Sequence, residues 1–456
     1  MTEETATPTQ SIRKFHAEGG PRRPSGEPVW LTGVRRRAFE HFRETALPER
    51  KMEAWKNISL DYLLDTPFVF SVVSAAAAVG KVASLSSLSE SLGGVYRLVI
   101  AGGRCAGNLS ETAGLPDGAV MTDLMAALAS RPERWRPYLE KNAKTACGPF
   151  GDLNTLGFTG GALIYLPEGC KLNLPAHLLL THSLRSSSPA LICGKILIVL
   201  EKSAELTLVS THENESGTEA LLNWTADVSL AENAKLKWID VLRDTASAYG
   251  ILNLNARLER AAELNMISLS GGEVRARYQT NVAFEGEEAS VDLKGLLFLT
   301  GNSQRSDVIN VFHQASHCVS RQLYKNILAG TAQAEYNSLV HVAEGTAGSD
   351  ADQLNRSIIL SDGARAYSRP QLKIDADEVK ASHGSATGQL QEEEIFYLRS
   401  RGLSPEEAEF ALTYGFAQEI LSEVGIPGLR DYLEKWAAEN LHRMAAAMEG
   451  KGVTRE

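Results

Sequence analysis

Residues 200–206 read Leu200-Glu-Lys-Ser-Ala-Glu-Leu206, and this seven-residue pattern occurs three more times in the middle of the chain. In each copy a leucine is followed by two mostly polar residues, a small or turn-forming residue, an alanine or cysteine, a polar residue and a second leucine. The other copies are Leu166-Pro-Glu-Gly-Cys-Lys-Leu172, Leu230-Ala-Glu-Asn-Ala-Lys-Leu236 and Leu258-Glu-Arg-Ala-Ala-Glu-Leu264, so the four begin at intervals of 34, 30 and 28 residues. Looser copies begin at Phe284, Leu328, Val342, Leu360 and Ile374. A regular internal repeat of this period indicates a solenoid.

Short alternating runs lie between the copies, such as Lys195-Ile-Leu-Ile-Val-Leu200 and Lys235-Leu-Lys-Trp-Ile-Asp240, and they predict short strands. Strands that turn at a small residue and return at a nearly constant interval are typical of a coiled parallel sheet. We therefore predict a mainly β fold in which residues 151–385 form a right-handed parallel β-helix, since parallel crossovers are almost always right-handed. Both ends of such a rod need a cap or a partner to cover unpaired strand edges.

Helical regions are predicted on both sides of this core. Residues 1–150 form an N-terminal helical or mixed domain, with a helix over 31–46 and an amphipathic segment over 122–141. Residues 386–456 form a C-terminal helical domain with helices over 391–401, 404–424 and 429–448. The second of these opens with Ser404-Pro-Glu-Glu407, a capping box. The Ala- and Ser-rich stretch 71–94 is interpreted as either a helix or a linker.

Composition limits the classes of function. The 456 residues include 46 Lys and Arg against 56 Asp and Glu, a net charge of −10, which disfavours nucleic acid as a partner. Five scattered cysteines, Cys105, Cys147, Cys170, Cys193 and Cys318, form neither a disulfide framework nor a CxxC zinc pattern and favour a reducing compartment. The longest apolar stretch has 12 residues (68–79), against the roughly 20 that span a bilayer. We expect a cytoplasmic protein without a membrane segment.

Two groups of residues could carry chemistry. His313, His317 and Cys318 form an HxxxHC pattern whose imidazoles and thiolate suit a soft metal, although a buried cysteine beside a hydrogen-bonded histidine would have the same sequence. His383 stands between small residues where the last solenoid turn meets the helical cap, and it is either a functional or a structural histidine. The sequence has no GxxxxGK[ST] loop, GxSxG elbow or HExxH motif, so we do not expect an ATPase or an enzyme of those classes.

A set of longer motifs resembles one protein family. The motifs are Leu47-Pro-Glu-Arg-Lys-Met-Glu-Ala-Trp-Lys56, Leu153-Asn-Thr155, Cys318-Val-Ser-Arg-Gln-Leu-Tyr-Lys-Asn-Ile-Leu328, Gln353-Leu-Asn-Arg356, Leu360-Ser-Asp-Gly-Ala364, Arg369-Pro-Gln-Leu-Lys-Ile374, Asp377-Glu-Val-Lys380, Ser382-His-Gly384 and Phe396-Tyr-Leu-Arg-Ser-Arg-Gly402. Together they resemble the SufD family, scaffold subunits of iron-sulfur cluster assembly, over about residues 45–425. Leu398 stands where the paralogous SufB family has cysteine, so the sequence is more similar to SufD.

The resemblance implies a non-catalytic scaffold that pairs with SufB through the β-helix, while ATP is hydrolysed by the partner SufC, which docks on the C-terminal helices. Leu398, Leu412, Phe416 and Ile420 would then contribute to the SufC-binding region. A transient iron-sulfur cluster forms at the interface between SufB and SufD, where the resemblance places His383, as a metal ligand or beside the ligands. Family members often have cysteine where Ala381 stands, so the sulfur partner would come from SufB. Whether reduced flavin binds the complex stays open.

Two other functions remain as alternatives. A polysaccharide-active β-helix enzyme would need clustered carboxylates on one exposed face, and no carboxylate pair recurs in register along the repeats. A homodimeric scaffold of the same superfamily would work without SufB.

The cysteines first indicated only a reducing compartment. With Ala381 and Leu398 in place of cysteine, their positions also suggest that this subunit takes its key thiol from a partner.

Overall fold

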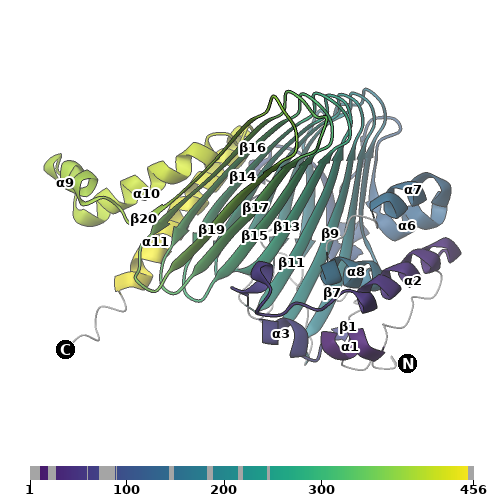
Figure 1. Cartoon of the computed structure of the whole chain (residues 1–456), viewed down its shortest axis with the longest axis horizontal. Coiled ribbons are helices and arrows are strands. Elements are labelled where there is room, and N and C mark those ends of the chain that lie inside the picture. Colours follow the sequence, from purple (N-terminus) through teal and green to yellow (C-terminus); the bar gives the residue numbers. More distant parts are fainter. Residues whose placement is uncertain are drawn as a thin grey trace.

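The computed structural model describes residues 11–18, 27–58, 60–70, 88, 90–142, 148–181, 188–213, 219–243 and 247–449. Two sheets of ten strands each run along the molecule, and successive strands from β5 onward alternate between them (Figure 1). Neighbours in each sheet are parallel except for the pairs β4–β5 and β2–β3. Strands β7 to β20 therefore make seven turns of two strands each, which confirms the predicted parallel β-solenoid.

The first sheet contains β1 (Val69–Phe70), β4 (Val120–Asp123), β5 (Gly161–Leu166), β7 (Ala190–Leu200), β9 (Ala220–Leu230), β11 (Ala248–Leu258), β13 (Arg275–Phe284), β15 (Gln304–His313), β17 (Gln333–Val342) and β19 (Arg365–Ile374). The second sheet contains β2 (Tyr96–Ala101), β3 (Arg104–Cys105), β6 (Ala176–Thr181), β8 (Glu205–Glu213), β10 (Lys235–Arg243), β12 (Glu263–Gly272), β14 (Ser290–Leu299), β16 (Val319–Leu328), β18 (Asp350–Ile359) and β20 (Lys380–Gly388). Strands β1 to β4 precede residue 151, so the N-terminal region completes the first turns of the solenoid.

The repeated motif marks one of the two corners of each turn. Its first residues stack in register, in the order Leu166, Leu200, Leu230, Leu258, Phe284, His313, Val342 and Ile374. The fourth residue of the motif has left-handed backbone geometry at Gly169, Ser203, Asn233 and Ala261, which explains why small and turn-forming residues occur there. Leu328 and Leu360 belong to the opposite corner, so the looser copies found in the sequence combine two rows.

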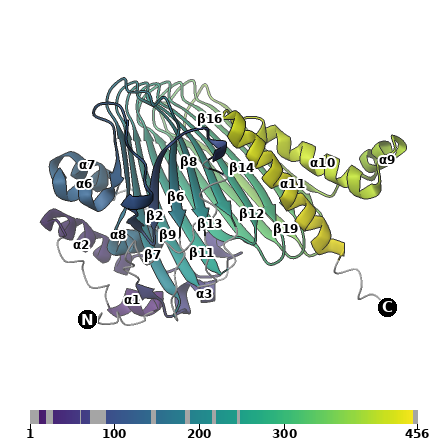
Figure 2. The same cartoon turned by 180° about the vertical axis from the view of Figure 1, so that it is seen from behind.

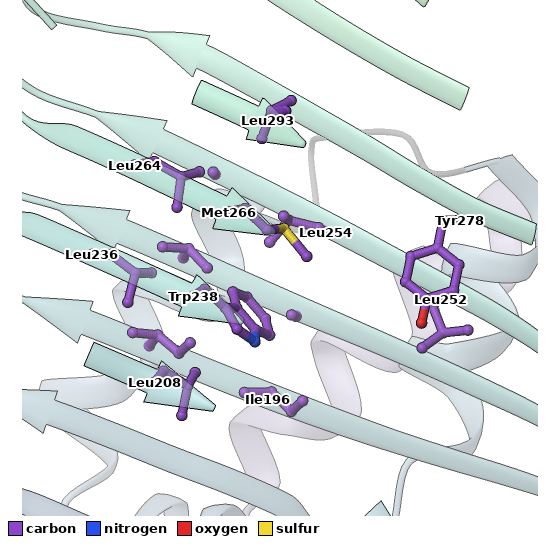
Figure 3. Packing of buried hydrophobic residues seen from close by; sticks show 14 of the residues in the cluster. Ile196, Leu208, Leu236, Trp238, Leu252, Leu254, Leu264, Met266, Tyr278 and Leu293 are labelled. Atoms are coloured by element: carbon purple, nitrogen blue, oxygen red, sulfur yellow. The ribbon is translucent and has the colours of Figure 1, made fainter. Parts of the chain in front are cut away.

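The interior between the two sheets is filled by side chains from alternate positions of every strand. Leucines, isoleucines and alanines dominate the first turns, and Trp238 and Met266 lie among them (Figure 3). Ala204, Ala234 and Ala262, the fifth residues of the motif, are fully buried at the corner, where the bend favours a small side chain. Gly194 faces this interior as well, and a Cβ there would lie 2.3 Å from the Trp224 ring.

N-terminal helices cover the outer face of the first sheet near its start. They are α1 (Ile12–Glu18), α2 (Val29–Glu44), α3 (Leu60–Asp65), α6 (Leu124–Ser130), α7 (Pro132–Asn142) and α8 (Gly148–Gly157), with the short 3-10 helices η1 (Glu53–Trp55) and η2 (Gly107–Leu109). Their apolar side chains form one cluster with outward residues of β5, β7, β9 and β11. The buried Arg35 guanidinium fixes α2 to the end of α8 by donating to the carbonyls of Thr155, Leu156 and Phe158.

C-terminal helices lie on the second sheet at the other end of the molecule (Figure 2). They are α9 (Glu392–Ser400), α10 (Pro405–Leu421) and α11 (Pro427–Glu449), close to the three predicted ranges. The capping box is confirmed, since Ser404 Oγ accepts from Glu407 N at 3.1 Å and Glu407 Oε2 accepts from Ser404 N at 2.7 Å. None of the helices in the described ranges is both long enough and apolar enough to cross a membrane. Most of the stretch 71–94 lies outside the described residues.

Candidate functional site at the open end of the solenoid

The last turn of the solenoid, β19 and β20, leaves two strand edges open. Within the described ranges β19 pairs only with β17, and β20 pairs only with β18. Tyr367 and Ile374 on β19 are among the most exposed large apolar side chains, at 39% and 42%. Open parallel edges with apolar side chains beside them are a template for another chain. This end of the molecule therefore has strand edges available for pairing with another chain.

His383 lies on β20 at this open end, and its side chain is exposed. Its register position belongs to a row of interior positions along the second sheet, which contains Leu208, Trp238, Met266, Leu293, Gln322, Gln353 and then His383. Leu208, Trp238, Met266 and Leu293 are buried in the apolar core between the sheets. The row becomes polar over its last three members, so His383 stands at the mouth of an interior that changes from apolar to polar.

The two glutamines beneath His383 take part in a buried hydrogen-bond network. Gln322 Oε1 accepts from Tyr336 OH at 2.8 Å and from Ser338 Oγ at 2.7 Å. Gln353 Nε2 donates to Ser338 Oγ at 2.8 Å, so one hydroxyl joins the two amides. Burial raises the pKa of Tyr336 above its usual value, so its phenol stays protonated and continues to donate.

Charged groups extend the polar interior toward the N-terminal turns. Arg305 is fully buried and donates to both carboxylate oxygens of Asp307, with its guanidinium 3.4 Å from the centroid of the Tyr278 ring. Tyr278 OH in turn donates to Asp240 Oδ2 at 2.9 Å. Burial opposes ionisation of Asp240, but His212 together with the hydroxyl donors Ser210 and Tyr278 lowers its pKa below the usual value. These ionic groups are paired inside the solenoid, as burial requires.

Ala381 is the inward residue that precedes His383 on the last turn. It is half-buried and stands in register with Ala351. The methyl group at this position provides no thiol beside the imidazole. In this chain His383 therefore lies at the open end without a neighbouring cysteine, although members of the family that the sequence resembles often have one at position 381.

The HxxxHC pattern is a further copy of the corner motif. His313 occupies the leucine row, His317 is the left-handed turn residue with φ 59°, and Cys318 takes the alanine position of the corner. Cys318 is fully buried, its thiol donates to the carbonyls of Gly286 and Ser316, and burial raises its pKa to about 11. No three His, Cys, Asp or Glu side chains in the described part of the chain are placed to share a metal ion. The interpretation as a three-ligand metal site is therefore wrong. Cys318 is instead a buried cysteine, as in the other interpretation of this pattern.

The four residues named for partner docking do not form one accessible face. Ile420 is fully buried with Ala417 and Leu421 against the second sheet, so it holds α10 on the solenoid and is not free to bind a partner. Phe416 is half-buried, with the Lys325 ammonium 4.1 Å from its ring centroid. Leu412 on α10 and Leu398 on α9 are also half-buried. Leu412 and Phe416 lie at the margin of the buried face of α10 and keep part of their surface accessible, so their role in docking stays a prediction.

Two neighbouring aromatic residues were missed from the sequence. Phe396 is 73% exposed and Tyr397 is 57% exposed on α9, which extends away from the solenoid (Figure 1). A surface groove of about 480 Å³ is lined by Phe396, Arg399, Ser400, Gly402, Leu403 and Pro405. The only signal in the sequence was the pair of adjacent aromatic residues in the motif that begins Phe396-Tyr-Leu-Arg, because the sequence does not show which face of this helix is buried.

Comparisons with known proteins agree with this architecture. The family model described as SUF system FeS cluster assembly, SufBD core domain, matches residues 182–416, and the SufBD protein N-terminal region matches residues 24–178. An iron-sulfur cluster assembly SufBD family protein of Synechocystis is 27% identical over 414 residues, which cover 89% of this chain and 90% of the relative. The iron-sulfur cluster assembly proteins SufD of Escherichia coli and Bacillus subtilis are 26% and 23% identical over 431 and 421 residues, which cover 91% and 89% of this chain and 92% and 93% of those proteins. The core match alone spans more than half of the chain, which therefore belongs to the SufBD family of iron-sulfur cluster assembly proteins and is SufD-like.

Proposed function

We propose that this protein is the SufD-type scaffold subunit of a SUF assembly complex in the cytoplasm. It pairs with a SufB-type paralogue at the open end of the solenoid, and a SufC-type ATPase docks on its C-terminal helices. A nascent iron-sulfur cluster forms next to His383 as cargo that later leaves. The chain itself acts as a scaffold, and ATP hydrolysis belongs to the partner.

The single observation that supports this proposal best is the position of His383. The imidazole is exposed on the last turn, between two open strand edges that a paralogous solenoid could extend with its own strands. Neutral imidazole is a weaker ligand for a cluster than thiolate, so it suits cargo that must be released. With Ala381 beside it, His383 depends on the partner for sulfur ligands.

The test uses the full chain co-expressed with the paralogue and the ATPase and purified without oxygen. We expect His383→Ala to leave the complex intact by size-exclusion chromatography and to lower cluster formation, followed by its visible absorbance, by at least about tenfold. Thr387→Ala is the matched control, because Thr387 is an exposed residue of the same strand, and it should assemble clusters normally. Normal assembly by His383→Ala would refute the site, and a chain that ignores both partners would refute the complex.

A further inference from the structure

Gln353 is the residue directly beneath His383. The two are paired in register on neighbouring parallel strands, β18 and β20, at positions that face the solenoid interior. Parallel strands lie about 4.8 Å apart, so side chains stacked on one face of them are within contact distance. Gln353 is fully buried, whereas His383 is exposed.

The orientation of the Gln353 amide is determined by its partners. Its nitrogen donates to Ser338 Oγ at 2.8 Å and to the backbone carbonyl of Gln371 at 3.4 Å. A carbonyl oxygen only accepts, and the Ser338 hydroxyl proton is already directed at Gln322 Oε1. The amide nitrogen must therefore face these two groups, which leaves Oε1 on the other side.

That oxygen has no hydrogen-bond donor among the described residues, although it is buried. A buried acceptor without a donor is unfavourable because it has lost its hydrogen bonds to water, so such an atom calls for a partner. The imidazole of His383 can supply an N–H from the adjacent rung by a change of side-chain rotamer. Histidines that bind metals commonly donate their second ring nitrogen to an oxygen in this way, which fixes the tautomer and the ring orientation.

We propose that Gln353 is a positioning residue for His383. Its Oε1 accepts a hydrogen bond from one imidazole N–H, which holds the ring in a single neutral tautomer and turns the other nitrogen, with its lone pair, toward the open end. The Ser338–Gln322–Tyr336 network holds the amide in place from below. The role of this hydrogen bond rests on the proposed function of His383. The hydrogen bond itself can be tested without partners.

The test compares Gln353→Met with Asn355→Leu in the full chain. Methionine matches the length and shape of glutamine without its amide. Asn355 is the matched control because it is a buried amide of the same strand, donates to the carbonyl of Tyr324, and pairs in register with Ser385 rather than with His383. The chain has 10 histidines, so ring ¹⁵N signals are assigned to His383 by their loss in His383→Gln. We expect one dominant tautomer in the wild type and in Asn355→Leu, and a mixture in Gln353→Met.

An unchanged tautomer ratio in Gln353→Met would overturn the inference, and so would an equal change in both variants. In the assembled complex we expect Gln353→Met to lower the rate of cluster formation about tenfold, with Asn355→Leu close to wild type. If His383→Ala leaves assembly intact while the tautomer depends on Gln353, the proposed function fails and the hydrogen bond stands. If His383→Ala blocks assembly and the tautomer ignores Gln353, only this inference fails.

Discussion

Single residues at the corners determine how each turn closes. Ala261 has φ 53°, a left-handed conformation that costs an alanine about 1 kcal/mol, while the adjacent Ala262 is fully buried inside the bend. We expect Ala261→Gly to raise the free energy of unfolding by about 0.5–1 kcal/mol, because glycine adopts positive φ without strain. Ala262→Gly should lower it by about 1–2 kcal/mol through the lost buried methyl group and added chain entropy. Urea unfolding measures both, and equal effects would contradict this account of the corner.

The buried His313 makes the free energy of unfolding depend on pH. Burial lowers its pKa to about 4, against an opposing effect of Asp350, and its Nε2 lies 2.9 Å from Ser320 Oγ. Between about pH 6.5 and 4 the unfolded chain therefore binds a proton that the folded chain does not, so stability falls as the pH is lowered, by at most about 1.4 kcal/mol per pH unit. We expect His313→Leu with Ser320→Ala to reduce this slope in urea titrations, with the remainder due to His177, whose pKa burial also lowers to about 4. A slope unchanged from the wild type would contradict a neutral buried His313.

Residue-level reasoning from the sequence succeeded where one position is constrained by local geometry. The motif identified the turn residue and the buried alanine, because both requirements repeat at every corner. It left two interpretations open at His313 and Cys318, since a histidine in the leucine row and a cysteine in the alanine row resemble a metal motif. Only the register, which shows them stacked with Phe284 and Ala289, reveals that they continue the repeat.

At the scale of elements, the ends of helices were predictable and their faces were not. The capping box placed the start of α10 correctly because its two hydrogen bonds are local. The buried face depends on how α10 lies on β14 and β16, where Lys325 donates to the Phe416 carbonyl at 2.8 Å. A long-range contact of this kind has no periodic signal in the helix sequence. For this reason the sequence could not show that Ile420 is buried while Leu412 and Phe416 stay partly accessible.

Helix α9 carries two exposed aromatic side chains at the C-terminal end of the solenoid. Phe396 and Tyr397 are exposed on an arm that leaves the solenoid, which suits an aromatic anchor for the ATPase. We expect the double variant Phe396→Ser with Tyr397→Ser to weaken ATPase binding at least about tenfold in calorimetric titrations, with an unchanged melting temperature. Ile374→Ser is the control, since it removes an exposed apolar side chain from the other site and should bind normally. Weaker binding by the control than by the double variant would exclude α9 as the anchor.

The whole molecule is stabilised unevenly along its axis. N-terminal helices cover the early turns on the first sheet, whereas α10 and α11 cover later turns on the second sheet, at β12, β14 and β16 (Figures 1 and 2). No further strand pairs with the outer edges of β19 and β20 within the described residues. The sequence predicted a rod with two ends that need covering. It could not show which end stays open, because N-terminal strands from outside the repeat close the other one.

This asymmetry predicts a gradient of amide hydrogen exchange along the free full-length chain. Alternate amides of an edge strand point away from its only neighbour, so β19 and β20 should exchange at least about tenfold faster than β9 and β11, which have partners on both sides. Adding the SufB-type paralogue should protect β19 and β20 selectively. Protection that instead grows with the concentration of this chain alone would favour a homodimer. Fast exchange that persists in the complex would show that the partner binds elsewhere, and the proposed site at His383 would lose its support.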